Sequence, residues 1–395
     1  MGDAIDPTVG YVTGLRLAID YGTSNTVGVL SFPDARVQPL LFDGSPLLPS
    51  AVYAAADGEL LVGRDAVRSA RLDPSRYEPN PKRRIDDGEV LLGDAYPVSV
   101  LIGAALAAVR REAERVAGGA VDELILTCPV AWGLRRRATL AAAARDAGLP
   151  APTLVAEPVA AARYFASLPG IRPDPIVVYD LGAGTFDVCL VRFGPDRPEA
   201  VAHSGLADVG GIDLDELIID RVRTAVDPGL WQRLGSPTTA GDRRAAQLLR
   251  DDARSAKETL SRHASAGLPV PLTDRDVVVG REEFDRLAEP LLARTVDATL
   301  DTIRTAGGAA GIFLVGGASR VPLVATLLHR ATGIAPTILE QPETVVPCSP
   351  PRPTPCRYRN RNLPKSRWNR RHRNRYRSRP TSSWPLPEMP VAEAG

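Results

Sequence analysis

Residues 176–191, IVVYDLGAGTFDVCLV, constrain the fold of this chain more than any other stretch. Ile176 to Tyr179 are β-forming residues without helical spacing, which predicts a buried strand, and the alternation after the glycines predicts a second strand. Gly182 and Gly184 lie between the two, where the missing Cβ lets the backbone turn tightly and approach a ligand. We therefore predict a β-hairpin whose turn combines acids, backbone amides and a hydroxyl.

A second stretch with the same pattern lies near the N-terminus. Residues 15–30, LRLAIDYGTSNTVGVL, again place an acid at the end of a strand, followed by a glycine, two hydroxyls and another strand. Asp20 and Asp180 are separated by about one domain length. One such hairpin could be an ordinary strand-ending turn. The pair favours two similar halves that face one nucleotide.

Charge is distributed unevenly along the chain. Residues 347–395 hold eleven arginines and one lysine against two glutamates, whereas the rest of the chain has an excess of acids. Only 5% of the residues are aromatic, so stacking is not expected to dominate recognition. The four cysteines have no metal-ligand spacing, and no apolar run reaches the length of a signal peptide or a membrane span. These features predict a reduced, cytoplasmic protein without membrane association.

The remaining periodicities predict α/β layers in each half. In the first half, strands are expected at 35–42, 124–127 and 153–155, and helices at 98–117, 134–147 and 158–167. In the second half, strands are expected at 200–205 and 312–317, a helix after 211, helices at 241–262 and 281–305 around a strand pair, and a helix at 321–332. The predicted domains are an extension (1–14), lobe I (15–170, with an inserted subdomain at about 43–98), lobe II (171–346, with an insert at about 227–305) and a tail (347–395).

Six blocks in order give the chain a family resemblance. They are IDYGTSNT, TCPVAWGLRRRATLAAAARDAGL with LVAEPVAAARYF, DLGAGTFDV, ADVGGIDLD, ARSAKETLS and LVGGASRVP. From about Leu15 to Val346 the chain resembles the nucleotide-binding domain of DnaK-type chaperones of the heat shock protein 70 family, within the actin-like ATPase superfamily. The resemblance implies an α/β, two-lobed actin-like ATPase fold with a duplicated ribonuclease H-like core, followed here by a disordered tail.

Phosphate binding must be shared by the two hairpins, because the chain has no Walker-type loop. Backbone amides of the two glycine-rich turns, 22–24 and 182–184, can form anion-binding concavities. Asp20, Asp180 and Asp187 would repel phosphate directly, so we expect them to bind Mg²⁺ mostly through its retained waters.

The resemblance also assigns catalytic roles. Lys82 matches the lysine that reaches the terminal phosphate, Glu157 the acid of the E-P-x-A-A block, and Thr185 a hydroxyl near the attacking water; Asp180 completes the predicted catalytic set. Taken alone, Lys82 could be a solvated charge in a basic segment and Glu157 a helix-start residue. Replacing Lys82 by Ala is expected to lower hydrolysis about 10²-fold or more while nucleotide still binds.

The predicted nucleotide site is larger. Its residues are Gly22, Thr23, Ser24, Asn25, Gly182, Ala183, Gly184, Thr185, Gly210, Gly211, Lys257, Ser261, Gly316, Gly317, Ala318, Arg320 and Glu343. Lys257 and Ser261 fall where the family contacts adenosine, although their spacing is equally compatible with a surface helix face. Arg254 stands where the family usually has an acid that helps to hold the ribose, and Ala183 replaces a glycine of the phosphate turn.

The arginine-rich tail has no helical or strand period and is expected to be disordered. Its aromatic residues, among them Tyr358 and Trp368, would allow nucleic-acid binding. We favour a frameshift instead, because QPETVV (341–346) resembles the start of the family's closing block and the pattern breaks at Pro347. GC-rich codons for Ala and Gly would yield Pro and Arg when read out of phase, which the other reading frames of the gene would reveal.

We therefore expect the ATP-binding and ATP-hydrolysing domain of a DnaK-like chaperone, which couples Mg·ATP hydrolysis to lobe closure and has no peptide-binding domain in these residues. The expected cofactors are ATP or ADP and Mg²⁺, the expected state is a monomer, and family resemblance adds co-chaperones or exchange factors as partners. The alternative is a bacterial actin-like scaffold ATPase, which TFDV and GGASRVP disfavour. A sugar kinase of this fold lacks a sequence cue for its substrate base.

Overall fold

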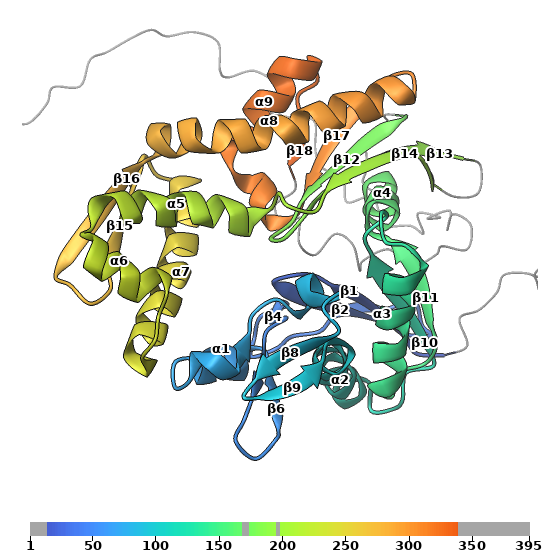
Figure 1. Cartoon of the computed structure of the whole chain (residues 1–395). Helices are drawn as coiled ribbons and strands as arrows, with labels where there is room; N and C mark the ends of the chain where they lie inside the picture. Colours follow the sequence, from blue (N-terminus) through green and yellow to red (C-terminus); the bar gives the residue numbers. More distant parts are fainter. Residues whose placement is uncertain (1–13, 168–173, 195–197, 339–395) are drawn as a thin grey trace, which may run out of the picture. The chain divides into compact units, whose positions relative to one another are not determined.

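The computed structural model describes residues 14–167, 174–194 and 198–338, all of which belong to one compact unit (Figure 1). The arginine-rich tail and Glu343 lie outside the described residues. The helices are α1 (Arg64–Ala70), α2 (Val98–Ala117), α3 (Leu134–Asp146), α4 (Glu157–Ser167), α5 (Gly211–Ala225), α6 (Pro228–Gly235), α7 (Ala240–Leu260), α8 (Arg281–Thr305) and α9 (Pro322–Thr332), with 3-10 turns η1 (Pro74–Arg76), η2 (Pro81–Arg84) and η3 (Gly317–Arg320).

Two sheets with the same strand order form the framework. The first contains β1 (Arg16–Tyr21), β2 (Asn25–Ser31), β3 (Val37–Pro39), β4 (Leu48–Pro49), β10 (Glu123–Cys128) and β11 (Pro152–Ala156), in the order β11-β10-β1-β2-β3 with β4 beside β2. The second contains β12 (Ile176–Leu181), β13 (Phe186–Phe193), β14 (Pro198–Leu206), β17 (Gly311–Val315) and β18 (Thr337–Ile338), in the order β14-β13-β12-β17-β18. In each sheet an antiparallel meander is extended by two parallel strands. The predicted duplication is confirmed.

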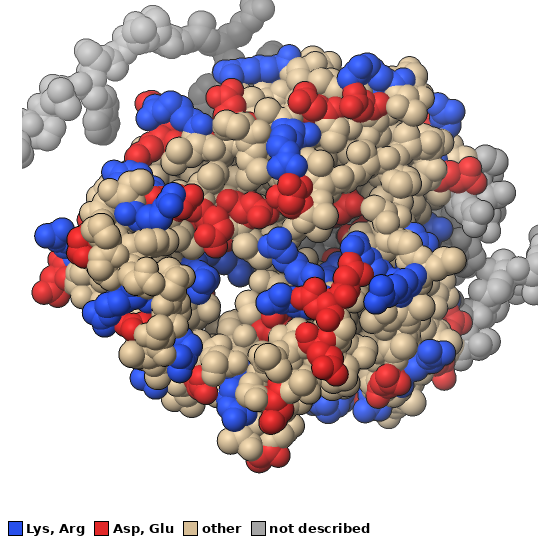
Figure 2. Space-filling view, viewed as in Figure 1, with Lys and Arg blue, Asp and Glu red and all other residues tan. Residues whose placement is uncertain are grey.

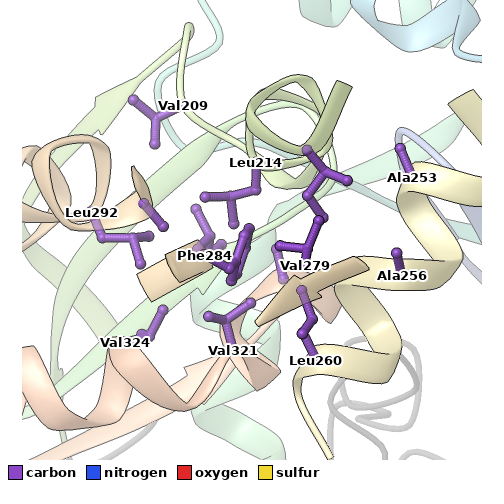
Figure 3. Packing of buried hydrophobic residues seen from close by; sticks show 14 of the residues in the cluster. Val209, Leu214, Ala253, Ala256, Leu260, Val279, Phe284, Leu292, Val321 and Val324 are labelled. Atoms are coloured by element: carbon purple, nitrogen blue, oxygen red, sulfur yellow. The ribbon is translucent and has the colours of Figure 1, made fainter. Parts of the chain in front are cut away.

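The second sheet is covered on both faces, which explains the uninterrupted apolar run of β12. Ile176 and Val178 point into a cluster with α4, whereas Val177 and Tyr179 belong to the larger cluster beneath α8. Successive strand residues face opposite sides of a sheet, so a strand buried on both sides must be apolar throughout. Figure 3 shows Phe284 of α8 among the side chains of this larger cluster.

The first sheet packs against α2 and α3. Leu17 and Ile19 of β1 contact the same buried cluster as Ile102 and Leu106 of α2 and Leu140 of α3. α2 covers the predicted residues, whereas α3 ends one residue before the predicted end. α2 is followed by Gly118 in the left-handed conformation that favours glycine.

Smaller elements extend from both sheets. β5 (Val52–Ala54), β6 (Leu60–Val62) and β7 (Tyr77–Glu78) form one small sheet near α1, and β8 (Glu89–Leu92) pairs with β9 (Asp94–Pro97). In the second half, α6 and α7 precede the hairpin of β15 (Ser265–Val270) and β16 (Arg275–Gly280). The sequence did not predict α6, whose first turn is capped by the Asp227 side chain.

One predicted strand was too long. Residues 35–42 were expected to be extended, but β3 covers only Val37–Pro39. Ala35 has φ 65° and belongs to the preceding turn, and Phe42 forms an isolated bridge with Ser45. Cys128 in β10 and Cys189 in β13 are buried free thiols. Among residues 14–167, 174–194 and 198–338, every helix is too short or too polar to cross a bilayer.

Candidate functional site

A cavity of about 730 Å³ lies where the two sheets present the ends of their central strands. β1 and β10 are parallel, as are β12 and β17, so their carboxyl ends lie at one edge of each sheet. The residues that follow these strands are therefore brought to the cavity, which is the usual position of a ligand site in α/β sheets. Figure 2 shows the surface hollowed between α7 and the elements of the first half.

The two predicted hairpin turns contact each other. A Cβ on Gly184 would lie 3.0 Å from Cγ2 of Thr23 and 2.9 Å from Cδ of Arg83, so the second turn lies close against Thr23 of the first turn and leaves little room for a side chain at position 184. Within the second turn, the Gly182 amide donates to the Thr185 carbonyl at 3.0 Å. The amide of Gly182 is thus engaged in the turn, which corrects the expectation that it is free to bind an anion.

The N-terminus of α5 packs against the second turn. The Gly211 amide donates to Gly182 O at 2.9 Å, and the Ile212 amide donates to Ala183 O at 2.8 Å. Gly210 lies directly behind, because a Cβ there would be 2.6 Å from Ala183 O. The positive end of this helix therefore faces the turn that is predicted to bind phosphate.

Gly316 brings a third backbone segment to the same place. It follows β17 with φ 81°, and a Cβ would lie 2.4 Å from Leu181 O and 2.5 Å from Oδ1 of Asp180. Only glycine suits this left-handed conformation and this close approach. The segment that continues into η3 therefore lies against Asp180.

Lys82 and Glu157 form a buried ion pair at the centre of the site. Lys82 Nζ donates to Oε1 of Glu157 at 3.0 Å, with side-chain exposures of 9% and 12%. The ring of Trp132 lies 5.5 Å from the Lys82 ammonium, within the range of a cation–π interaction. Burial opposes the charge of Lys82, but Glu157, Asp20 and Asp180 outweigh it and raise the pKa of Lys82. Lys82 is therefore charged and is not a solvated surface residue.

Three aspartates surround this pair. Burial and the nearby Glu157 raise the pKa of Asp20 to about 6, although Lys82 and a 2.6 Å hydrogen bond from Thr127 favour its charged form. Burial, again reinforced by Glu157, raises the pKa of Asp187 to about 7.

The third aspartate, Asp180, is affected most. Its pKa lies well above the ordinary value because of burial and of repulsion by Glu157, Asp187 and Asp20. The site therefore holds more buried negative charge than Lys82 compensates.

This excess of negative charge suits a divalent cation. Among the described residues, however, no group of three or more His, Cys, Asp or Glu side chains is placed to hold a metal ion directly. The arrangement fits Mg²⁺, which retains several waters and usually takes only one or two carboxylates together with substrate phosphates.

A second buried lysine lies on α7. Lys257 Nζ is 2.7 Å from Oδ1 of Asp215 and donates to Gly211 O at 2.7 Å. Burial lowers the pKa of Lys257, and Asp215 opposes this shift. The surface-face reading of Lys257 is therefore wrong. Ser261 lines the cavity, and its hydroxyl donates to Lys257 O within the helix at 3.2 Å.

Most of the predicted site residues meet at this cavity. Its lining includes Asp20, Gly22, Thr23, Ser24, Asn25, Lys82, Glu157, Asp180, Gly182, Ala183, Thr185, Asp187, Gly211, Lys257, Ser261, Gly316, Gly317, Ala318 and Arg320. Gly184 and Gly210 are not in the lining and instead allow the close packing behind it.

Sequence reasoning missed Thr127, Trp132 and Asp215 as partners of the site. The position of Asp215 four residues after Gly211, about one helical turn along α5, was the available signal, whereas the contacts of Thr127 and Trp132 join distant segments.

Comparison with known proteins assigns the family. A family model described as Hsp70 protein matches residues 89–347. The chain belongs to the Hsp70 family. Relatives include a chaperone protein HscA homolog of Bordetella petrii, 32% identical over 84% of this chain and 56% of its own length. The chaperone protein DnaK of Thermotoga neapolitana is 29% identical over 84% of this chain and 57% of its own length. A chaperone protein HscA homolog of Methylobacillus flagellatus is 31% identical over 84% of this chain and 56% of its own length.

The chain spans about half the length of these Hsp70 relatives. Family membership identifies the duplicated sheets as the two-lobed actin-like ATPase fold and the chain as carrying an Hsp70 nucleotide-binding domain. Members of the family are ATPases that bind ATP or ADP with Mg²⁺.

Proposed function

We propose that this chain binds Mg·ATP in the cavity between its two sheets and hydrolyses it. The contact of Thr23 with Gly184 supports the proposal most strongly, since it places two glycine-rich turns within reach of one phosphate chain. Phosphoryl transfer depends largely on positioning and on neutralising charge, which a pair of opposed turns and a buried lysine can provide.

The phosphates would be bound mainly by backbone groups. In the second turn, the amides of Ala183 and Gly184 remain as donors, because Gly182 is engaged within the hairpin. In the first turn, Gly22, Thr23 and the hydroxyl-bearing Ser24 face the cavity. Such concave arrays of amides bind anions.

Lys82 would stabilise the charge that develops on the transferred phosphoryl group. Its ammonium is held in place by Glu157 and is charged over the whole physiological pH range, because its pKa is raised. Glu157 and Thr185, which both line the cavity, would orient the attacking water. A preorganised charge of this kind contributes most in a site from which water is excluded.

Asp20, Asp180 and Asp187 would hold Mg²⁺ mostly through its water molecules. The cation supplies positive charge at the phosphates. The raised pKa values of the three aspartates support this role, because a divalent cation would offset both the burial and the repulsion that raise them.

At the level of the whole protein, we propose that hydrolysis is coupled to closure of the two lobes in a DnaK-like chaperone of the cytoplasm. The lobes would comprise residues 15–170 and 171–346. Co-chaperones or exchange factors would act on this domain, as the family resemblance implies.

The proposal is tested by titrating the full chain with ATP in the presence of Mg²⁺ and measuring phosphate release. We expect saturable binding and slow hydrolysis, and Lys82→Ala should retain binding while hydrolysis falls about 10²-fold. Absence of saturable binding would refute the proposal. Equal losses of binding and turnover in Lys82→Ala would refute the role of Lys82.

A further inference from the structure

One face of α7 lines the cavity beyond the phosphate turns. The residues of this face recur at helical spacing and are all polar; they are Gln247, Arg250, Asp251, Arg254, Lys257, Glu258 and Ser261. If the phosphates of a nucleotide lie at the two turns, its sugar and base must extend along this face. Figure 2 shows Lys and Arg side chains along the α7 side of the opening.

Arginines also approach from the opposite side of the opening. A smaller cavity of about 290 Å³ adjoins the first one, sharing Pro49 and Val67 with it, and its other lining residues are Arg64, Arg68 and Arg71. Among the described residues, neither Arg68 nor Arg71 forms a salt bridge with a carboxylate. These guanidinium groups are therefore available to an external anion.

The end of α1 is held against α7. The Arg244 guanidinium of α7 donates to the Leu72 carbonyl at 3.0 and 3.3 Å. Burial raises the pKa of Asp251 on α7. Arg71, the residue before Leu72, is one of the groups that partly offset this rise. Arginines from α1 and α7 thus lie around one region of the opening.

Negative and positive side chains therefore lie in different parts of the site. The floor is acidic, with Asp20, Asp180 and Asp187 around a single lysine, and it requires a cation beside the phosphates. The outer region is rich in arginine, and the carboxylates within it compensate only in part. Arg254 pairs with Glu258 at 3.2 Å, but both side chains are about half exposed, so this ion pair is weak. An anionic ligand can therefore replace Glu258 as the partner of Arg254.

The adenosine of ATP is uncharged and would leave the guanidinium groups of the outer region without an anionic partner. We propose that Arg68, Arg71, Arg250 and Arg254 form a subsite for a phosphate group on the ribose. The preferred ligand would then be a nucleoside 5′-diphosphate or 5′-triphosphate with a further phosphate on the 2′ or 3′ oxygen. This inference rests on the proposed function, because it takes the 5′-phosphates to lie at the two turns.

The test compares three probes by calorimetric titration of the full chain with Mg²⁺ present at constant ionic strength. They are ADP, adenosine 3′-phosphate 5′-diphosphate and adenosine 2′-phosphate 5′-diphosphate. A phosphate that accepts charge-assisted hydrogen bonds from one or two arginines should bind about 10- to 100-fold more tightly. The two phosphorylated probes show which oxygen carries the recognised group.

Arg71→Gln should reduce this preference at least about threefold and leave the affinity for ADP nearly unchanged. Arg254→Gln should reduce the preference by a similar factor, and its affinity for ADP is measured in the same titrations. Arg111→Gln is the matched control, because Arg111 is exposed on α2 and forms no salt bridge with a described residue. It should alter neither affinity.

Equal affinities for ADP and both ribose phosphates would overturn the inference while leaving the proposed function intact. A preference that survives Arg71→Gln and Arg254→Gln would overturn the assignment to this cluster. Failure of every probe to bind would instead refute the proposed function, and the inference with it.

Discussion

Lys82 combines a structural and a catalytic role, and the geometry of its ion pair allows the two to be separated. Its ammonium lies 3.0 Å from Glu157, and the exposures of the two side chains are 9% and 12%. Replacing one partner of a buried pair leaves the other charge uncompensated, which typically costs about 3–5 kcal/mol. We therefore expect Lys82→Met to lower the free energy of unfolding by about that amount.

The double variant Lys82→Met/Glu157→Gln should be more stable than Lys82→Met alone, because no unpaired carboxylate remains at position 157. Replacing both members of a buried pair is often close to neutral, so we expect roughly 2 kcal/mol or more to be regained. Recovery should be incomplete, since Lys82 also faces Asp20 and Asp180. Urea denaturation without nucleotide at pH 7.5 measures both values.

Hydrolysis should respond differently. Both variants should lose about 10²-fold or more in single-turnover phosphate release at saturating Mg·ATP, because neither contains the ammonium. Lys257→Met is a suitable control, since Lys257 is also a buried, paired lysine of the cavity, and we expect it to weaken binding more than turnover. If the double variant recovers hydrolysis along with stability, Lys82 acts only by neutralising Glu157, and its catalytic assignment is wrong.

Three further predictions concern the remainder of the site. Folding raises the pKa values of Asp20 (to about 6) and Asp187 (to about 7), so the folded protein binds more protons than the unfolded chain in this range. The ligand-free protein should therefore lose stability as pH rises from about 4 to 7, by roughly 3 kcal/mol for Asp20 alone. Melting curves should show this pH dependence, and Mg²⁺ with ADP should reduce it. Gly316→Ala places a Cβ at φ 81° against Leu181 and Asp180 of β12 and should cost about 1–3 kcal/mol and weaken ATP affinity in a titration, whereas unchanged values would show that the segment can shift. Tyr179→Phe removes a buried 2.7 Å hydrogen bond with Thr295 and should cost about 1–2 kcal/mol in urea denaturation; a large loss of ATP hydrolysis would contradict its purely structural role.

The two hairpins illustrate what could be predicted from local sequence. A continuous apolar run followed by Asp, Gly and a hydroxyl determines a strand, its end and a tight turn within a few residues. Because both copies carry this pattern, their acids fall at equivalent strand positions, and the structure confirms the repeated strand order. The long helices α2, α7 and α8 were also predictable, because their periodic pattern of apolar residues is likewise a local feature of the sequence.

Contacts between distant segments could not be predicted in this way. Lys82 and Glu157 are separated by 75 positions, and Thr127 reaches Asp20 across 107. The family resemblance nominated Lys82 and Glu157 individually, but their pairing depends on how η2 and α4 pack around the first sheet. The use of the Gly182 amide inside its own turn, and the burial of Lys257 against Asp215, were likewise decided by packing.

The sequence by itself thus determined the repeated strand–turn–strand unit and the chemical groups that each turn carries, because these depend on side-chain pattern and short-range backbone preference. Only the tertiary structure decided that the two turns touch, that Lys82 is buried and charged, and that arginines at α1 line a cavity adjoining the one lined by arginines of α7. Packing of two sheets and their connecting helices brings these groups together, and the resulting burial sets their charge states.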